Sequence, residues 1–189
     1  MKNIVKYLHE AGQLTRVANS GYWLVGMQNP PSVAEHVYRA STIAFVLAKL
    51  ENADAEKAAS IVLFHDMQET RINDLHKVAQ KYIDLKKVEV EVLRDQLMSL
   101  PNELASSIKN LQETYKSENT PEGIIARDAD LLDYGFKAKE LIELGYKDAQ
   151  NHIDNITPLI KTESAKKLLK ELDSSQPNDW WKDLKKIER

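Results

Sequence analysis

The sequence of 189 residues contains no cysteine, and this absence excludes both disulfide bonds and metal sites built on thiolates. Glycine and proline are scarce, with six residues of each, whereas long stretches are rich in Ala, Leu, Glu and Lys. No stretch approaches the roughly 18 consecutive apolar residues that a membrane span requires. With few helix breakers and many helix formers, the chain is predicted to be soluble and helical throughout.

An excess of positive charge is also missing, since the formal net charge is −3. Without a basic surface, the composition gives no reason to expect nucleic acid as a partner. The length fits one domain that can bury a substantial core. Near the N-terminus, Lys6, His9 and Glu10 interrupt the apolar residues, so we expect no signal peptide and a cytoplasmic location.

Local signals divide the chain into helices joined by short breaks. Ser32 and Glu35 have the spacing of a capping box, which predicts a helix from there to about Leu50. Pro101 and Pro121 suit the first turns of helices over 101–115 and 121–144. An ordered loop is expected over 17–31, and the other helices are predicted over 4–16, 55–69, 83–100, 148–155, 162–172 and 179–186.

The predicted fold is therefore an all-α bundle that forms a single domain over residues 1–189. Its motif-bearing core covers about 4–145, and helices over about 146–189 follow without an assigned role. Trp180 and Trp181 are expected to pack their rings onto the bundle rather than to form a partner surface.

His65 and Asp66 form the most informative pair, because they follow the apolar run Ile61–Phe64 inside a predicted helix. Two ionisable groups beside an apolar run are costly to bury without a partner, which favours a shared ligand over a solvated helix face. His36, in the first turns of the preceding helix, adds a second imidazole. Nitrogen and oxygen donors of this kind suit a divalent cation held within a helical bundle.

A further carboxylate ligand is expected from the helix over 121–144, where Asp128, Asp130 and Asp133 are candidates. Spacing alone does not choose between them. Glu69 lies one helical turn beyond His65 and can exchange a proton with a water molecule or a leaving oxygen beside the metal. These residues together predict a metal-dependent hydrolase.

The pattern of His36, His65-Asp66 and a later Asp resembles the motif of the HD-domain superfamily of metal-dependent phosphohydrolases. More closely, the chain resembles the 5'-deoxynucleotidase branch of that superfamily. The matching stretches are Gln13–Val17, Asn29–Arg39, His65–Glu69, Asp74–Leu75 and Ala129–Asp133. The resemblance implies an HD-domain bundle with one metal ion held by His36, His65, Asp66 and Asp130.

The resemblance also implies roles for residues beside the metal. Glu69 matches the catalytic acid or base of the family, and Asp74 matches a second carboxylate that orients water or substrate. The family usually has an aromatic residue, commonly Trp, at the position that Tyr22 occupies here, and Trp23 follows it. Either ring is expected to shape the sugar and base pocket.

Gly21 departs from the family pattern, because some members place a phosphate-binding arginine there. Another cation must then meet the phosphate charge, and Arg16, Arg39 and Arg71 are the candidates. His76 is the only histidine between the dyad and Asp130, so one metal ion is expected rather than two. With nitrogen and oxygen ligands only, that ion is expected to be Mn, Co, Fe, Ni or Mg.

The expected activity is hydrolysis of deoxyribonucleoside 5'-monophosphates to deoxyribonucleoside and phosphate, by a homodimer of this chain. One alternative is a guanosine tetraphosphate pyrophosphohydrolase, although Thr70 stands where that family has a second acid. The other alternative is a nucleotide-binding regulator without turnover. The complete ligand set together with Glu69 argues against the regulator, because a non-catalytic pocket needs no acid beside its metal.

Overall fold

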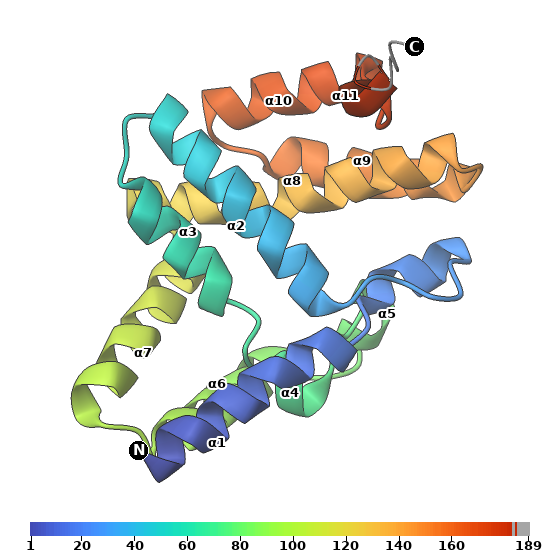
Figure 1. Cartoon of the computed structure of the whole chain (residues 1–189). Helices are drawn as coiled ribbons and strands as arrows, with labels where there is room; N and C mark the ends of the chain where they lie inside the picture. The colour runs from blue at the N-terminus through green and yellow to red at the C-terminus, as the bar shows by residue number, and fades with distance from the viewer. Residues whose placement is uncertain (183, 185–189) are drawn as a thin grey trace, which may run out of the picture.

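The computed structural model describes residues 1–182 and 184, and every regular element in that part of the chain is helical. A single backbone bridge between Ala18 and Ser32 is the one β-type pairing among these residues. The all-α prediction is therefore confirmed. Figure 1 shows the N-terminal helices at one end of the molecule and the C-terminal helices at the other.

The elements follow one another with short connections. In chain order they are α1 (Lys2–Ala11), η1 (Gly12–Arg16), η2 (Ser20–Val25), α2 (Val33–Leu50), α3 (Ala55–Phe64), α4 (Glu69–Ile72), α5 (Lys77–Gln80), α6 (Leu85–Leu97), α7 (Asn102–Ser117), α8 (Pro121–Glu143), η3 (Lys147–Ala149), α9 (Gln150–Ile156), η4 (Thr157–Leu159), α10 (Glu163–Ser174) and α11 (Asp179–Lys182).

The two longest helices begin where the sequence predicts. Ser32 and Glu35 form a complete capping box at the start of α2, in which each side chain bonds the backbone of the other residue. Thr120 caps α8 through the backbone N–H of Gly123, and Pro121 occupies the first helical position. These caps fix where the long helices start, and therefore which of their residues face the site.

The main hydrophobic core lies where α2, α3 and α8 pack together (Figure 1). Small residues such as Ala44, Ala58 and Ala129 are fully buried there and let the helix axes approach closely. A second cluster lies towards α1, α6 and the start of α7, with Met67 among its members. Because α2 contributes to both clusters, its N-terminal half lies between them, and that half carries His36.

Several boundaries differ from the predicted ones. The helix expected over 55–69 ends at Phe64, and the expected loop over 17–31 contains the 3₁₀ helix η2. The helix expected over 4–16 ends at Ala11 and continues as η1, and the short helix α5 was not predicted. The helix expected over 179–186 is described only as α11, and positions 183, 185 and 186 lie outside the described residues.

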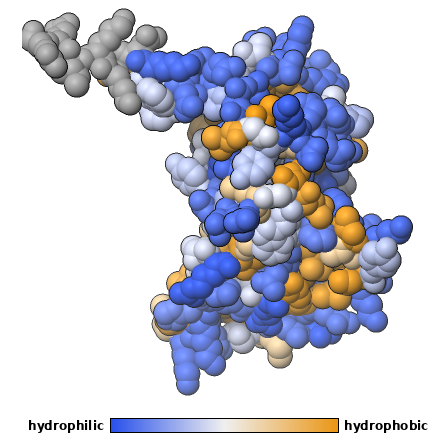
Figure 2. Space-filling view, turned by 90° about the vertical axis from the view of Figure 1, so that its right-hand side faces the viewer, coloured by the Kyte–Doolittle hydropathy of each residue, from blue (hydrophilic) through white to orange (hydrophobic). Residues whose placement is uncertain are grey.

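Trp180 also differs from expectation, because its side chain is 76% exposed rather than packed onto the bundle. On one face, hydrophobic side chains gather near the middle of the molecule, while both ends are mostly hydrophilic (Figure 2). Within residues 1–182 and 184, no helix has the length and apolar character needed to cross a membrane.

Candidate metal centre and active site

Four predicted metal ligands converge from three parts of the bundle. His36 lies in the first turn of α2, His65 and Asp66 follow the last residue of α3, and Asp130 lies in the middle of α8. His36 Nε2 is 3.2 Å from Asp130 Oδ1, and His65 Nε2 is 3.1 Å from Asp66 Oδ2. The remaining histidine–carboxylate pairs measure 3.6 and 3.7 Å. One small space is therefore surrounded by two imidazole nitrogens and two carboxylate oxygens.

His65 and Asp66 lie just beyond the end of α3 at Phe64, and both border the same space. On a regular helix, consecutive side chains point about 100° apart. Residues 65–68 instead form turns, and the expectation that the His-Asp pair lies inside a helix is wrong. The Nδ1 atom of His65 donates to the carbonyl oxygen of Val62 at 2.6 Å, which fixes the ring at this corner.

The donor set fits a divalent cation. His36 and His65 each direct Nδ1 to an oxygen acceptor, so Nδ1 carries a proton and Nε2 is the nitrogen that each ring can offer to a cation. Ligand atoms of His36, His65 and Asp66 all lie within 4.8 Å of one another. Four electron-rich atoms this close repel one another unless positive charge lies between them, and a bound metal ion supplies that charge.

Without a metal, protons take over part of this role. Burial lowers the pKa of His36, but its hydrogen bonds with Asp130 and Asp133 outweigh burial and raise that pKa well above the ordinary value. Burial raises the pKa of Asp130, yet the bonds with His36 and His65 outweigh it and hold that pKa well below the ordinary value. The site therefore favours the charged form of Asp130, which is the form that binds a cation.

The outer oxygen of Asp130 is held by two further residues. Tyr115 donates its hydroxyl to Asp130 Oδ2, and Arg127 donates to the same oxygen at 2.9 Å. Arg127 also bonds the Tyr115 hydroxyl at 2.5 Å. Because both donors engage Oδ2, Asp130 keeps Oδ1 directed towards the two histidines.

Glu69 and Asp74 interact electrostatically with the cluster of histidines and aspartates. Burial, with Asp66 and Asp74 nearby, raises the pKa of Glu69 well above the ordinary value. Its Oε2 atom is buried and has no hydrogen-bond partner within the described chain. Burial also raises the pKa of Asp74, whose Oδ2 accepts a bond from the backbone N–H of Ser20 at 2.6 Å. Glu69 thus offers an uncommitted carboxyl group next to the donor set.

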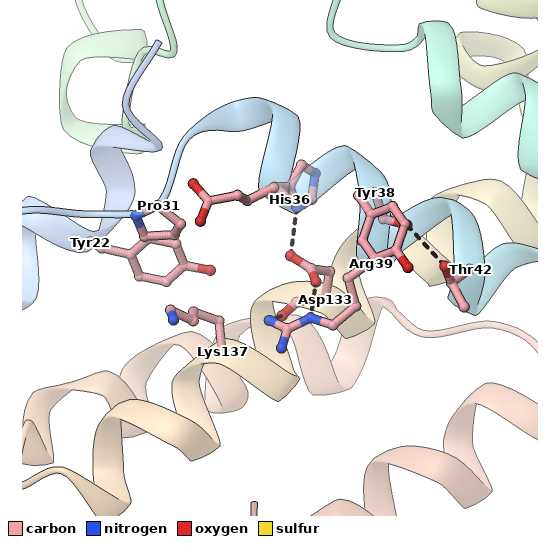
Figure 3. Close-up of a pocket in the computed structure, with 9 residues that line it drawn as sticks. Tyr22, Pro31, His36, Tyr38, Arg39, Thr42, Asp133 and Lys137 are labelled. Atoms are coloured by element: carbon pink, nitrogen blue, oxygen red, sulfur yellow. Dashed lines mark hydrogen bonds and ion pairs between the residues drawn. The ribbon is translucent and has the colours of Figure 1, made fainter. Parts of the chain in front are cut away.

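An aromatic wall continues from His36 towards η2. The ring of Tyr134 lies 5.3 Å from that of His36 and 5.8 Å from that of Tyr22. Tyr22 is 1% exposed, and its hydroxyl has no partner among the described residues. Tyr22 lines a cavity of about 310 Å³ together with His36 and Lys137, and Figure 3 shows how these side chains lie around it.

The other predicted substrate residues are placed differently. Trp23, next to Tyr22, is 51% exposed. The guanidinium of Arg16 bonds the neutral side chain of Gln13 at 3.2 Å. Arg39 lines the same cavity as Tyr22 but is engaged by Asp133 and Glu140.

Arg71, the third cation considered for phosphate, is paired with Glu10 at 2.6 Å. Two carboxylates on α8 that spacing could not separate from Asp130 also have distinct partners. Asp128 accepts bonds from the backbone N–H groups of Lys161 and Thr162, whereas Asp133 bonds His36. Sequence reasoning missed the contribution of Tyr115, for which no motif gives a signal.

The chain is similar in sequence and in structure to known proteins. The profile of a family described as HD domain matches residues 11–173. The chain is 27% identical to 5'-deoxynucleotidase HDDC2 of Bos taurus over 79% of this chain and 71% of that protein. The 5'-deoxynucleotidase HDDC2 of Danio rerio is 28% identical over 76% and 72%, respectively. A solved structure of a conserved hypothetical protein from Pyrococcus furiosus has a TM-score of 0.75 and 29% identity, covering 90% of this chain and 99% of that one.

Proposed function

The chain belongs to the HD domain family, and on that premise we propose that it is a metal-dependent phosphomonoesterase acting on deoxyribonucleoside 5'-monophosphates. The relatives named 5'-deoxynucleotidase support this substrate class. The observation that carries the proposal is the convergence of His36, His65, Asp66 and Asp130 beside the unpartnered carboxyl of Glu69.

In the proposal, one divalent ion would be held by His36, His65, Asp66 and Asp130. When bound, it polarises a phosphoryl oxygen and makes a water molecule more acidic. Mn, Co, Fe, Ni and Mg all accept nitrogen and oxygen donors of this kind. One ion per chain is proposed because the described residues hold one such cluster.

Glu69 is proposed to manage the proton on the leaving side. Hydrolysis breaks the bond between phosphorus and the 5'-oxygen, and that oxygen must gain a proton to leave as an alcohol. Burial raises the pKa of Glu69 and so favours its protonated form, which is the form that a proton donor needs. Water attacks phosphorus from the opposite side, in line with the bond that breaks.

Asp74, Tyr22 and Trp23 are proposed to hold the sugar and water. Asp74 Oδ2 is fixed by the backbone of Ser20, so its other oxygen keeps a defined direction. The buried ring of Tyr22 is proposed to exclude a ribose 2'-hydroxyl, and the exposed ring of Trp23 is proposed to cover the base.

Arg16 is proposed as the cation that meets the phosphate, since Arg39 and Arg71 are already paired with carboxylates. Arg39 is proposed to border the substrate space from the cavity side. We also propose a homodimer, consistent with large exposed apolar side chains along α2, namely Tyr38, Phe45, Val46 and Leu50.

The deciding experiment measures phosphate release from nucleoside mono-, di- and triphosphates, each with Mn²⁺, Co²⁺, Fe²⁺, Ni²⁺ or Mg²⁺. Release from deoxyribonucleoside 5'-monophosphates is the expected result. Activity confined to guanosine tetraphosphate would replace the proposed function with a pyrophosphohydrolase. Nucleotide binding without any release would indicate a non-catalytic regulator.

A further inference from the structure

A chain of hydrogen bonds runs outward from the proposed metal ligand His36, on the side away from the other ligands. His36 Nδ1 donates to Asp133 Oδ2 at 2.7 Å, and Arg39 Nε donates to Asp133 Oδ1 at 2.5 Å. Arg39 also bonds Glu140, which pairs with Lys137 at 3.2 Å. Figure 3 shows Asp133 between the His36 ring and the Arg39 guanidinium, with dashed lines to both.

These residues come from two facing helices at matched positions. His36 and Arg39 are three residues apart on α2, so they share one face of that helix. Asp133 faces them from α8, two turns before Glu140. Since α2 and α8 pack directly on each other, the arrangement is built into the core of the fold.

Asp133 is nearly fully buried, and a buried carboxylate is stable only when its oxygens are paired. His36 occupies one oxygen and Arg39 the other, which leaves Asp133 no freedom to turn. The carboxylate in turn holds the proton of His36 on Nδ1 and directs Nε2 towards Asp66 and Asp130. A carboxylate behind a ligating histidine commonly orients the ring and strengthens it as a ligand.

We propose that Asp133, anchored by Arg39, is a positioning residue that sets the orientation and tautomer of His36 for metal binding. Arg39 acts through Asp133 and does not need to touch the metal or the substrate. The inference rests on the proposed role of His36 as a ligand. It assigns Asp133 a task distinct from that of Asp128, the other fully buried carboxylate nearby on α8, which holds the backbone of residues 161 and 162.

The test measures binding of Co²⁺ to the substrate-free protein by calorimetry and by the visible absorption of the bound ion. Asp133→Ala is expected to weaken Co²⁺ affinity by about 10–100-fold and to change the absorption spectrum. Asp133→Asn keeps the side-chain volume and is used if the alanine variant fails to fold. It is also expected to bind Co²⁺ more weakly than the wild-type protein. Asp128→Asn is the matched control, and it should lower the thermal stability of the metal-free protein while Co²⁺ affinity stays near the wild-type value.

The role of Arg39 is tested by a double variant. Arg39→Ala alone should weaken Co²⁺ affinity, but combining it with Asp133→Ala should cause no further loss, because Arg39 acts through Asp133. Additive losses would overturn the relation between the two residues. Wild-type protein that binds Co²⁺ no better than Asp133→Ala would overturn the inference alone, whereas wild-type protein that binds no divalent ion would overturn the proposed function as well.

Discussion

Asp74 accepts a hydrogen bond from the backbone N–H of Ser20 at 2.6 Å, although 54 positions separate the two residues. The bond ties the segment after α4 to the first residue of η2, which carries Tyr22 and Trp23. The hydrogen bond therefore connects the proposed catalytic carboxylate of Asp74 directly to the helix that carries the proposed sugar wall. A substitution that shifts η2 is expected to disturb Asp74 as well.

The first prediction concerns the proton donor. Glu69→Gln keeps the shape of the side chain but cannot donate a carboxyl proton, so turnover should fall by about 100-fold or more. Metal content and nucleotide affinity should change little, because Glu69 is not one of the four ligands. Glu163→Gln, on the exposed start of α10, is the matched control. Wild-type turnover in Glu69→Gln would move the proton transfer to another group, with Asp74 next to be tested.

The second prediction concerns the number of metal ions. The purified protein should hold one divalent ion per chain, and His65→Ala should lose most of it, since one of four donors is removed. Elemental analysis after dialysis against metal-free buffer measures both values. His9→Ala, at an exposed position of α1, should retain the ion. Two ions in the parent protein, or full occupancy in His65→Ala, would contradict the proposed centre.

The third prediction concerns the sugar. A wall supported by the buried Tyr22 ring should favour 2'-deoxyribose by about 10–200-fold in kcat/KM, the range that shape selection usually gives. Parallel kinetics on deoxyribo- and ribonucleoside 5'-monophosphates measure the ratio. Tyr22→Ala should reduce the ratio, whereas Tyr22→Phe should keep it because only the unpartnered hydroxyl is lost. Equal rates on both sugars in the parent protein would remove the sugar preference and leave the phosphatase activity intact.

The fourth prediction concerns stability away from the site. Glu10 accepts bonds from Arg71, Gln96 and Thr70, and so joins α1 to α4 and α6. The bonds from Arg71 outweigh burial and lower the pKa of Glu10 below its ordinary value of 4.5. Glu10→Gln should therefore reduce the free energy of unfolding at pH 7 by about 1–3 kcal/mol.

The pH dependence of that loss follows from the direction of the pKa shift. With a lowered pKa, the stabilisation from Glu10 is complete above pH 4.5 and is lost as the pH falls through the folded-state pKa. Urea unfolding at several pH values should show the difference between wild type and Glu10→Gln shrinking in acid. Glu171→Gln, at an exposed position of α10, serves as the control. A difference that stays constant into acid would show that the charge of Glu10 is not its source.

The sequence predicts well what depends on neighbouring residues. The capping box of Ser32 and Glu35 is local, and it placed the start of α2 and hence His36 within its first turn. The start of α8 at Pro121 is equally local. The end of α3 is different, because residues 55–69 contain no glycine or proline to mark a break.

That break has partners far along the chain. The Phe64 carbonyl accepts a hydrogen bond from the Gln112 side chain at 2.8 Å, and Gln112 also bonds Gln68 beyond the break. Gln112 is 48 positions away from Phe64, so the residues around Phe64 in the sequence give no sign of this contact. The helix therefore looks continuous in sequence, and the contacts at its end come from α7, which is distant along the chain.

The choice among the carboxylates of α8 is open for the same reason. Asp128, Asp130 and Asp133 are all buried, and composition treats them alike. They differ only in their distant partners. Asp128 bonds the backbone of residues 161 and 162, Asp130 lies beside Nε2 of both histidines, and Asp133 bonds Nδ1 of His36. The prediction of Asp130 as the metal ligand rests on resemblance to a known motif, because residue spacing alone does not distinguish the three carboxylates.

The four donor atoms come from α2, α8 and the corner after α3, so they meet only in the folded chain. An ion that binds the native state and not the dispersed ligands shifts the folding equilibrium, by roughly 2.7 kcal/mol when its free concentration is 100 times its dissociation constant. The supply of metal in the surroundings would then set the lifetime of the protein as well as its rate of turnover. Chelation would leave a chain that opens more often and that proteases degrade faster.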